Sequence, residues 1–438
     1  MLIDLFYKSY CYARSNGMSA FFSLVYRKVE HGFSVKLMQK NTFLKRNETK
    51  VTDVLNAQFQ QLMPLRIFTI NDSKLRRINL VTDSVNSASL FGGVGTALIF
   101  AVMLANKLNA RLRIITRTDR VKPENINHVL SLYEIAPAFE MQFKFAAFYD
   151  QNYKIDIAKN DLFITTSWWT TFSVLPSVPH NNIIYLLQED ERMFYPFGDE
   201  RLKCENVLKN KNIRFVVNTK LLFNHFVSDG FGNIAEHGYW FEPAFPTKIY
   251  YPRKKSYKEK RKFFYYARPN NPRNLFYTGL DIIERCVAQN IFDLDEWEIC
   301  LVGKNIPSFE FVGGYRPTVF EDLTWAEYAE IIGQIDLGLS LMYTPHPSYP
   351  PLDLVASGAV VVTNRFLGKK NLSCYSSNLI CADLECDSII SAIRLGISLS
   401  GNKKQKEINF SKNNLLTDWN ISFSRAISEI ERMYDVQD

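Results

Sequence analysis

A proline-rich loop that runs into a buried-looking helix and strand carries residue types suited to anion binding. Residues 344–353 read TPHPSYPPLD, and the chain continues LVASGAVVVTN. Proline rings make the loop stiff, and the first N–H groups of the following helix lack internal partners. We expect these N–H groups and Ser348 to hold a diphosphate, with Asp353 in the first helical turn facing a nucleoside. Asp353 has a helix-capping alternative, and His346 is either structural or in contact with a transferred sugar.

Two arginines follow the first strand predicted in the second half of the chain. Arg268 and Arg273 lie in YYARPNNPR, separated by a proline-stiffened turn. Guanidinium groups match phosphate oxygens in bidentate fashion, so we assign both to the diphosphate, although surface arginines often have no ligand. The candidate donor-binding residues are Arg268, Arg273, Gly303, Lys304, Tyr343, Ser348, Tyr349 and Asp353. The candidate catalytic residues are Arg268, Arg273, His346 and Asp353.

Glycines and acids follow two predicted strands in the first half. FGGVG, residues 91–95, lets a backbone approach a ligand closely but lacks the G-x-G-x-x-G spacing of dinucleotide sites. A tight turn is the alternative for FGGVG. QEDERMFYP, residues 188–196, places three consecutive acids at a strand end, where they could act as a base, bind a metal or bond sugar hydroxyls, or form a solvated turn. The candidate acceptor-binding residues are Gly93, Gly95, Gln188, Glu189 and Asp190.

Alternating strands and helices must position these loops. From Arg77, apolar strands are predicted at residues 77–84, 111–119, 161–169, 182–190 and 213–219, with a helix over 96–108. After a basic, proline-containing linker at 241–262, strands are predicted at 262–269, 297–304, 309–315, 336–342 and 359–364, with helices at 278–289 and 324–334. This rhythm predicts α/β architecture: two doubly wound, Rossmann-like domains facing across a cleft. Ligands then sit at carboxyl ends of strands, near Asp83–Ser84, Thr165–Trp168 and Gln188–Glu191.

Composition narrows the class of protein. The 438 residues exceed one ordinary core, and a net charge of +7 fits an anionic ligand or membrane surface but is too diffuse for nucleic acid. Seven scattered cysteines form no C-x-x-C pair, so we expect no zinc site and a reduced, cytoplasmic chain. The longest apolar run, 94–105, is too short to span a bilayer. Basic, aromatic residues 1–50 are either a helix peripheral on the inner membrane face or an ordinary leader.

Several of these segments resemble the GT-B glycosyltransferases, specifically the WsaF-type rhamnosyltransferases of bacterial surface-glycan and rhamnan assembly. QEDERMFYP is similar to the Q-D-x-E-x-x-F-x-P element of that group, and YYARPNNPRN is similar to its Y-x-A-R-P-x-x-P-R-N element. The stretch SLMYTPHPSYPPLDLVASGAVVVTN resembles the donor-site loop and helix. LTDWNISFSRAISEIERMYD resembles the tail in which a Trp opens a final helix that crosses back to the first domain. The resemblance runs from about Arg77 to the end.

The resemblance implies a nucleotide-sugar donor in the second domain, an acceptor in the first, and retention of configuration without a metal or other cofactor. Arg268 and Arg273 match the basic residues that hold the diphosphate. Asp353 matches the second of two glutamates spaced eight apart, while the first falls on Pro345, which leaves His346 as the nearest substitute. A shorter Asp353 is compatible with a deoxyribose nucleotide such as dTDP.

The resemblance also suggests domain boundaries and a function. The expected parts are a basic leader (1–76), an acceptor-side domain (77–243), a nucleotide-sugar-binding domain (244–415) and a returning C-terminal helix (416–438). The first hypothesis is transfer of a sugar, foremost rhamnose from dTDP-rhamnose, onto a lipid-linked or oligosaccharide surface glycan. A catalytically degraded carbohydrate-binding protein is the alternative. An NAD-dependent enzyme is disfavoured, because the sequence lacks the G-x-G-x-x-G motif of dinucleotide sites. Inversion would need a base among Glu189, Asp190 and Glu191.

Overall fold

The computed structural model describes residues 50–72, 76–86, 90–254 and 259–435, and it divides the chain into two compact units, residues 1–60 and 61–438. In the first unit the described residues form helix α2 (Val51–Gln58), none of whose side chains is buried. The segment expected at a membrane surface lies outside the described residues except for Lys50. Within the described ranges, every helix is too short or too polar to cross a bilayer.

The first of two large sheets has seven strands among the described residues, and each neighbouring pair is parallel. In spatial order they are β4 (Gln142–Phe145), β3 (Arg111–Thr116), β2 (Arg77–Thr82), β6 (Asp161–Thr165), β7 (Ile183–Leu187), β8 (Arg214–Asn218) and β9 (Gly238–Phe241). β1 (Ile67–Thr69) and β5 (Ile155–Ile157) form a separate small sheet. The apolar runs of β2, β6 and β7 are buried on both faces, as expected for a covered parallel sheet.

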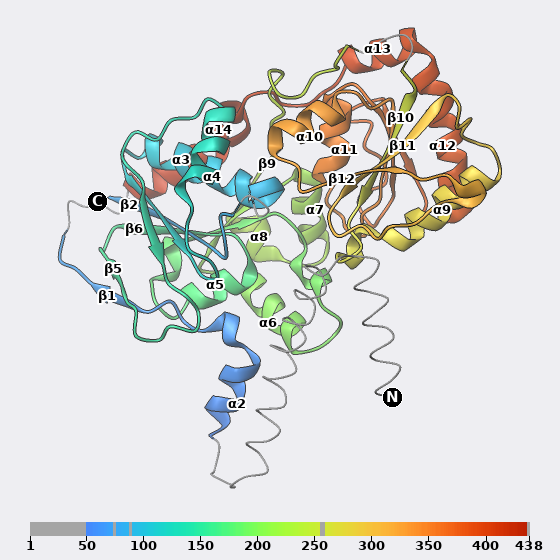
Figure 1. Cartoon of the computed structure of the whole chain (residues 1–438). Helices are drawn as coiled ribbons and strands as arrows, with labels where there is room; N and C mark the ends of the chain where they lie inside the picture. The colour runs from blue at the N-terminus through green and yellow to red at the C-terminus, as the bar shows by residue number, and fades with distance from the viewer. Residues whose placement is uncertain (1–49, 73–75, 87–89, 255–258, 436–438) are drawn as a thin grey trace. The chain divides into compact units, whose positions relative to one another are not determined.

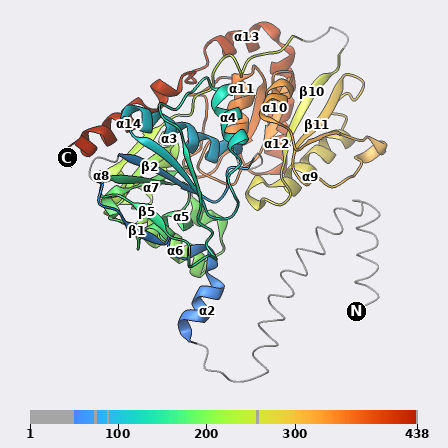
Figure 2. The same cartoon turned by 60° about the vertical axis from the view of Figure 1, so that its left-hand side comes forward.

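Helices cover both faces of this sheet (Figures 1 and 2). One apolar cluster joins alternate strand residues to α3 (Gly95–Lys107), α4 (Pro123–Leu132) and α14 (Trp419–Asp435). Strands β6 to β9 also contact α5 (Trp168–Val174), α7 (Lys220–Ser228) and α8 (Gly232–His237), and α5 packs on α6 (Asp199–Leu208). The short helical turns are η1 (Gln60–Leu62), η2 (Leu90–Val94), η3 (His180–Asn182) and η4 (Glu191–Phe194).

The second sheet has six parallel strands in the described part of the chain. Their order is β12 (Thr318–Glu321), β11 (Trp297–Gly303), β10 (Arg261–Ala267), β13 (Leu337–Ser340), β14 (Val360–Asn364) and β15 (Leu379–Ala382). One face packs on α9 (Phe276–Ala288) and α12 (Cys386–Gly401), the other on α10 (Trp325–Ile332) and α11 (Tyr349–Ala356). The remaining elements are η5 (Pro272–Asn274), η6 (Val312–Gly314) and α13 (Lys403–Ser411).

We call the parts built on these two sheets the first and second lobes, and the chain passes between them at two neighbouring places. After β9, Ala244 forms a parallel bridge with Leu416, and the Phe245 N–H donates to the Leu416 carbonyl at 2.7 Å. Helix α14 then packs on α3 and β9 of the first lobe, with Trp419 and Phe423 in its apolar cluster. Two chain segments therefore join the lobes side by side.

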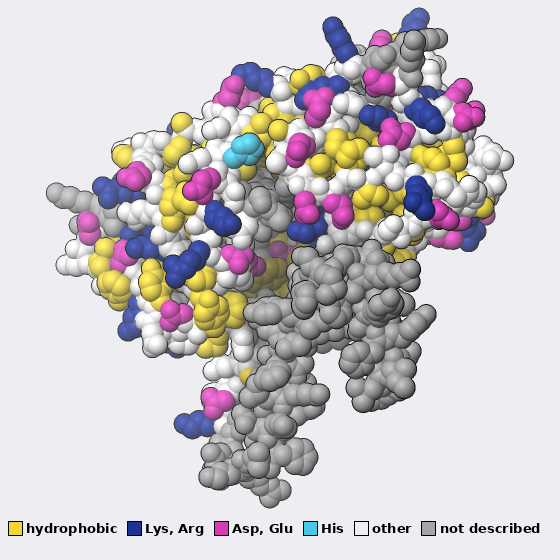
Figure 3. All heavy atoms as spheres, in the orientation of Figure 1, with side chains coloured by type: hydrophobic (Ala, Val, Ile, Leu, Met, Phe, Trp, Pro, Cys, Tyr) yellow, Lys and Arg dark blue, Asp and Glu magenta, His cyan; other side chains and the backbone are white. Residues whose placement is uncertain are grey.

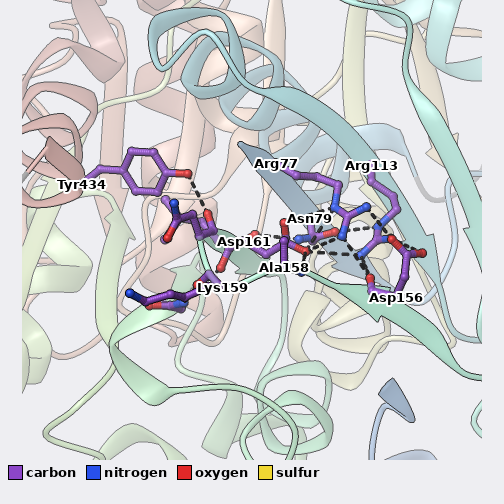
Figure 4. A network of polar contacts seen from close by, with 11 residues as sticks. Arg77, Asn79, Arg113, Asp156, Ala158, Lys159, Asp161 and Tyr434 are labelled. Carbon is purple, nitrogen blue, oxygen red and sulfur yellow. Dashed lines mark hydrogen bonds and ion pairs between the residues drawn. The ribbon is translucent and has the colours of Figure 1, made fainter. Parts of the chain in front are cut away.

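The amino ends of the first sheet are fixed by a buried network of charges (Figure 4). Arg77 lies 2.6 Å from Asp161 and 2.7 Å from Asp156. The fully buried Arg113 donates to Asn79 at 2.7 Å and to Asp156 at 3.0 Å. Two cations and two carboxylates balance one another, which is the condition under which buried charge is tolerated. This end of the sheet is therefore structural, and ligand chemistry belongs at the opposite end.

The doubly wound, two-sheet fold predicted from the strand–helix rhythm is confirmed. One predicted strand is wrong: residues 309–315 form a turn around η6, because Gly313 and Gly314 both adopt φ 77°. The strand in that place is β12, whose half-exposed residues gave no clear apolar run. The strand order reverses between β2 and β6 in the first sheet and between β10 and β13 in the second. Such switch points are where open parallel sheets bind ligands.

Candidate functional site

The arginine loop and the proline-rich loop flank the switch point of the second sheet. Arg268 and Arg273 follow β10, and residues 341–348 follow β13, its neighbour in the sheet. The two loops are joined by a backbone hydrogen bond from the Tyr343 N–H to the Arg273 carbonyl at 2.7 Å. Arg268 donates to the Tyr266 hydroxyl at 3.2 Å, while the guanidinium of Arg273 lies 4.2 Å from the centre of the Phe194 ring of the first lobe.

The proline-rich loop turns into α11 one residue earlier than the prolines suggest. Ser348 precedes the helix with φ 72°, and Tyr349, Pro350 and Pro351 form its first turn. Two of these three residues have no N–H group, so the helix start offers fewer backbone donors than we expected. The Ser348 N–H is already bound to His346 Nδ1 at 2.9 Å. Anion binding here must rely mainly on side chains.

His346 and Ser348 carry side-chain atoms suited to that role. His346 is buried, and its Nδ1 accepts the Ser348 N–H, which leaves the proton on Nε2. His346 Nε2 and Ser348 Oγ are both buried without a hydrogen-bond partner within the described residues. Burial, together with the charges of Lys369 and Arg273, lowers the pKa of His346 to about 3. A neutral His346 can therefore donate a hydrogen bond but does not act as a cation at neutral pH.

Asp353 lies elsewhere than expected. Our placement of Asp353 in the first turn of α11 is wrong, because the helix begins at Tyr349 and puts this residue in the second turn. Its side chain is 6% exposed and accepts a hydrogen bond from the Tyr328 hydroxyl at 3.1 Å. Burial raises the pKa of Asp353 to about 8, although the hydroxyls of Tyr328 and Tyr250 lower it. The structure gives Asp353 tyrosine neighbours, and a nucleoside contact stays a prediction.

Three more predicted donor residues lie around the same edge of the second sheet. Gly303 ends β11 so close to β10 that an added Cβ would stand 1.7 Å from the Ala267 carbonyl oxygen, which explains glycine at this position. Lys304 is partly exposed and lies 3.8 Å from Asp322. The half-exposed Tyr343 packs on the Phe366 ring, with ring centres 4.2 Å apart. A role in donor binding stays a prediction for all three.

Tyr349 contacts the first lobe, and donor binding stays a prediction for this residue. Its hydroxyl lies 2.6 Å from Thr96 Oγ1 and accepts from Asn218 Nδ2 at 2.8 Å. The predicted glycine loop is a helical turn, η2, that leads directly into α3. Within it Gly92 has φ 73° and lies against the Tyr349 ring. The contact joins the start of α11 to the start of α3.

Other predicted acceptor residues meet in this region of the first lobe. Gln188 Nε2 donates to the Gly93 carbonyl at 2.6 Å, and an added Cβ on Gly93 would crowd that amide at 3.1 Å. Gly95 is buried at the start of α3 and lines a cavity of about 10 Å³ with Tyr349 and Trp419. The structure thus brings Gly93 and Gln188 together, while their contact with an acceptor stays a prediction.

The three consecutive acids after β7 have different surroundings. Asp190 is buried, and hydrogen bonds from His225 and Arg192 outweigh the effect of burial and lower its pKa to about 2. Glu191 accepts from the Trp168 N–H and the Tyr185 hydroxyl, and burial raises its pKa to about 8. Both side chains are thereby committed to contacts inside the first lobe.

Glu189 instead reaches across to the second lobe. Its Oε2 lies 2.8 Å from Arg273 Nη1. Its Oε1 accepts from the Thr344 hydroxyl and from the Asp190 N–H. The acid loop and the donor loops, predicted as separate sites, therefore meet at one ion pair.

Sequence reasoning missed three residues of this site. Lys369 is fully buried beside the donor loop, where its Nζ donates to the Met342 carbonyl at 3.2 Å, and burial lowers its pKa to about 8. Thr344 contacts Glu189, as described above. Trp169 donates to Asp83 at 2.7 Å and packs near Phe194. A Lys-Lys pair in a loop normally indicates exposure, so no sequence signal distinguished Lys369.

The cations of the site are enclosed. On the face shown in Figure 3, acidic and basic side chains are interspersed and gather into no large patch of one sign. The described residues contain no group of three His, Cys, Asp or Glu side chains that could hold a metal ion. The positive charge of the site instead comes from Arg273, whose side chain is 18% exposed, and from Lys369, which is fully buried.

Two doubly wound lobes, each with a switch point at the carboxyl edge of its sheet, have the architecture of the GT-B fold. The WsaF N-terminal domain matches residues 77–220 and the WsaF C-terminal domain matches residues 261–394, together more than half of the chain. The chain belongs to the WsaF family. The resemblance stated from the sequence is thus confirmed.

Known proteins agree with this class. The O-antigen biosynthesis protein RfbC of Myxococcus xanthus is 26% identical over 278 residues, which are 61% of this chain and 20% of RfbC. The chain thus spans only about a fifth of that relative. Anabaena Alr3699/HepE in complex with UDP and glucose superposes with a TM-score of 0.53 at 13% identity, over 81% of this chain and 99% of that one. Sucrose-phosphate synthase from Thermosynechococcus elongatus gives a TM-score of 0.54 at 10% identity, over 83% and 99%. These two similarities show the fold.

Proposed function

We propose that this enzyme transfers a sugar, foremost rhamnose from dTDP-rhamnose, onto a growing bacterial surface polysaccharide with retention of configuration and without a metal. The observation that carries the proposal is the set of donors at the switch point of the second sheet. Arg273 and Lys369 supply positive charge, and His346 Nε2 and Ser348 Oγ supply buried donors without other partners in the described residues. A diphosphate needs this combination of charge and directed hydrogen bonds.

The chemistry asked of such a site is electrostatic. When the bond between sugar and diphosphate breaks, negative charge develops on the leaving phosphate, and preorganised cations stabilise it in the transition state. The acceptor hydroxyl gives its proton to that phosphate on the same face of the sugar. Retention is favoured because Asp190 and Glu191 are held by contacts inside the first lobe, which leaves only Glu189 of the three acids as a candidate base for inversion.

The sugar and the acceptor rest on similarity. Membership of the WsaF family makes dTDP-rhamnose the first donor to test, and the similarity to an O-antigen biosynthesis protein favours a surface polysaccharide as acceptor. Asp353 Oδ2 accepts from Tyr328, whereas Oδ1 is buried without a hydrogen-bond partner in the described residues, so a contact with a deoxyribose nucleoside stays a prediction. UDP is tested beside dTDP for that reason.

The test is calorimetric titration of the full chain with dTDP, UDP and GDP in buffer that contains EDTA. We expect metal-independent binding of one nucleotide, followed by sugar transfer from its rhamnose conjugate to a lipid-linked glycan. NMR of the product then shows whether the anomeric configuration is retained. Failure of all three nucleotides to bind would contradict the donor site, and an inverted product would assign the base to Glu189.

A further inference from the structure

The contact between Glu189 and Arg273 joins a carboxylate of the first lobe to the cation assigned to the donor diphosphate. We propose that Glu189 competes with the donor diphosphate for Arg273, so that donor binding must displace this carboxylate. The inference rests on the proposed function and adds an internal competitor to it. It also assigns Glu189 a role in setting donor affinity, beyond the acceptor contact predicted for it.

Glu189 is bound in the way a phosphate group would be. One carboxylate oxygen lies 2.8 Å from Arg273 Nη1, and the other accepts from the Thr344 hydroxyl on the donor loop. Arginine pairs with carboxylates and phosphates through the same N–H groups. The two donor-side groups that contact Glu189, the Arg273 guanidinium and the Thr344 hydroxyl, are therefore suited to a diphosphate oxygen as well.

The carboxylate and a diphosphate cannot share this site without a cost. The side chain of Glu189 is 12% exposed, so like charges at this position are poorly screened by solvent. The face of the Arg273 guanidinium lies over the Phe194 ring at 4.2 Å, which leaves its N–H edges for anions. A diphosphate on those edges faces repulsion from Glu189 until the carboxylate moves away.

Glu189 has few contacts inside its own lobe that would hold its side chain in place. The neighbouring Asp190 and Glu191 are fixed by buried partners in the first lobe. Within the described residues, Glu189 has one hydrogen bond to its own lobe, from the adjacent Asp190 N–H at 3.1 Å. Its other polar contacts, with Arg273 and Thr344, lie on the donor side. Displacement therefore exchanges one anion for another on the same donors.

The experiment compares Glu189→Gln with wild type by titration with UDP and dTDP. Gln keeps the size and acceptor oxygen but removes the charge, so we expect binding about 5-fold to 20-fold tighter. The matched control is Glu134→Gln, which removes the same charge from a pair that also links the lobes, with Lys248 at 2.6 Å, but is exposed and remote from Arg273. Its affinity should equal that of wild type. Thermal unfolding verifies that each variant is folded.

A double-mutant cycle makes the cause specific. In an Arg273→Ala background, Glu189→Gln should lose most of its effect on nucleotide affinity, because the group for which Glu189 competes is gone. The inference would be overturned if Glu189→Gln, and Glu189→Ala as a second variant, bound nucleotide no more tightly than wild type. In that case the proposed function would still stand if Arg273→Ala weakened nucleotide binding by the otherwise unchanged protein. Absence of nucleotide binding in wild type and all variants would overturn both.

Discussion

The carboxyl ends of the two sheets differ in how their charged side chains are satisfied. After β7 in the first lobe, Asp190 and Glu191 are bound by partners of the same lobe. Beside β10 and β13 in the second lobe, Lys369 has one described side-chain contact, with a carbonyl, and Arg273 is paired by the other lobe. Two of the three acids at the first edge are thus satisfied within their own lobe, whereas Glu189 and Arg273 each find their ion-pair partner in the other lobe.

This difference separates structural charge from charge available to a ligand. Buried charges are costly unless paired, so a fold keeps unpaired ones only where a function uses them. The first lobe shows the structural pattern twice, at the acid loop and in the network around Arg77 at its opposite end. The second lobe keeps buried donors and cations beside its switch point, and for this reason we place the proposed anion-binding site there.

The largest expected effect is that of Arg273→Ala. Removal of one charge donor from a preorganised site costs about 100-fold or more in rate, and we expect a comparable loss in kcat/KM for the donor. Arg268→Ala should weaken binding less, by about 10-fold, because Arg268 has no described contact with the acid loop. The control is Arg285→Ala on α9, an exposed arginine paired with Asp281. Equal nucleotide affinity in all three variants would remove the contrast between the lobes.

Lys369→Met tests the buried cation. We expect donor affinity to fall about 10-fold, with no loss of thermal stability, because a desolvated charge is replaced by an apolar side chain of similar length. The adjacent Lys370→Met is the matched control, since Lys370 is exposed. The pKa of Lys369 is about 8, so the charged form is lost as pH rises through that value. Wild-type affinity should therefore decline above pH 8, and the decline should vanish in Lys369→Met.

Trp169→Ala tests the opposite edge. The half-buried indole beside Asp83 and Phe194 offers an apolar face of the kind that packs on sugars. We expect KM for the acceptor to rise roughly fivefold, while the dissociation constant of the donor nucleotide is unchanged. Trp240→Ala on β9 is the control. A change in donor affinity of Trp169→Ala would show that the two edges do not act separately.

Asp353→Asn should give the smallest effect, on stability. The folded-state pKa of about 8 lies above the ordinary value of 3.8, so the stability linked to Asp353 is fully present below pH 3.8 and is lost as pH rises toward 8. The melting temperature of wild type should therefore fall across this range more steeply than that of Asp353→Asn. The loss between low pH and pH 8 should differ between the two proteins by on the order of 2 °C or more. Nucleotide affinity should stay within about twofold. A large loss of nucleotide affinity would instead support the nucleoside contact predicted from the sequence.

Much of the fold was readable because its strands are long apolar runs. RINLVTDS and AVVVTN become β2 and β14 almost unchanged, since strands buried on both faces leave a continuous signal. β12 was missed because its residues alternate between partly buried and exposed, which leaves no apolar run, and the turn at Gly313 was mistaken for a strand. Short edge elements depend on neighbours that the local sequence does not reveal.

The candidate site divides in the same way. Strand order predicted which loops lie at the carboxyl ends of the sheets, and Arg268, Arg273 and Glu189 do lie in those loops, while their roles stay predictions. The pairing of Glu189 with Arg273 was not predicted, because it depends on how two lobes meet. Asp353 was placed in the first helical turn and lies in the second, because the helix begins at Tyr349, directly after Ser348 with its φ of 72°, one residue before the prolines. Lys369 had no signal because burial of a loop lysine is a tertiary effect.

The paired crossing at Ala244 and Leu416 makes the second lobe an insertion within the first. Helix α14 follows the inserted segment in sequence yet completes the apolar cluster of α3 and β9. A single recombination point in residues 245–415 would unite an α14 from one parent with an α3 from another. Two points, one on each side of the bridge, would exchange the whole anion-binding half and leave that cluster intact. If the donor site lies in the second lobe as proposed, a change of donor preference by recombination therefore requires two crossover points, one on each side of the bridge.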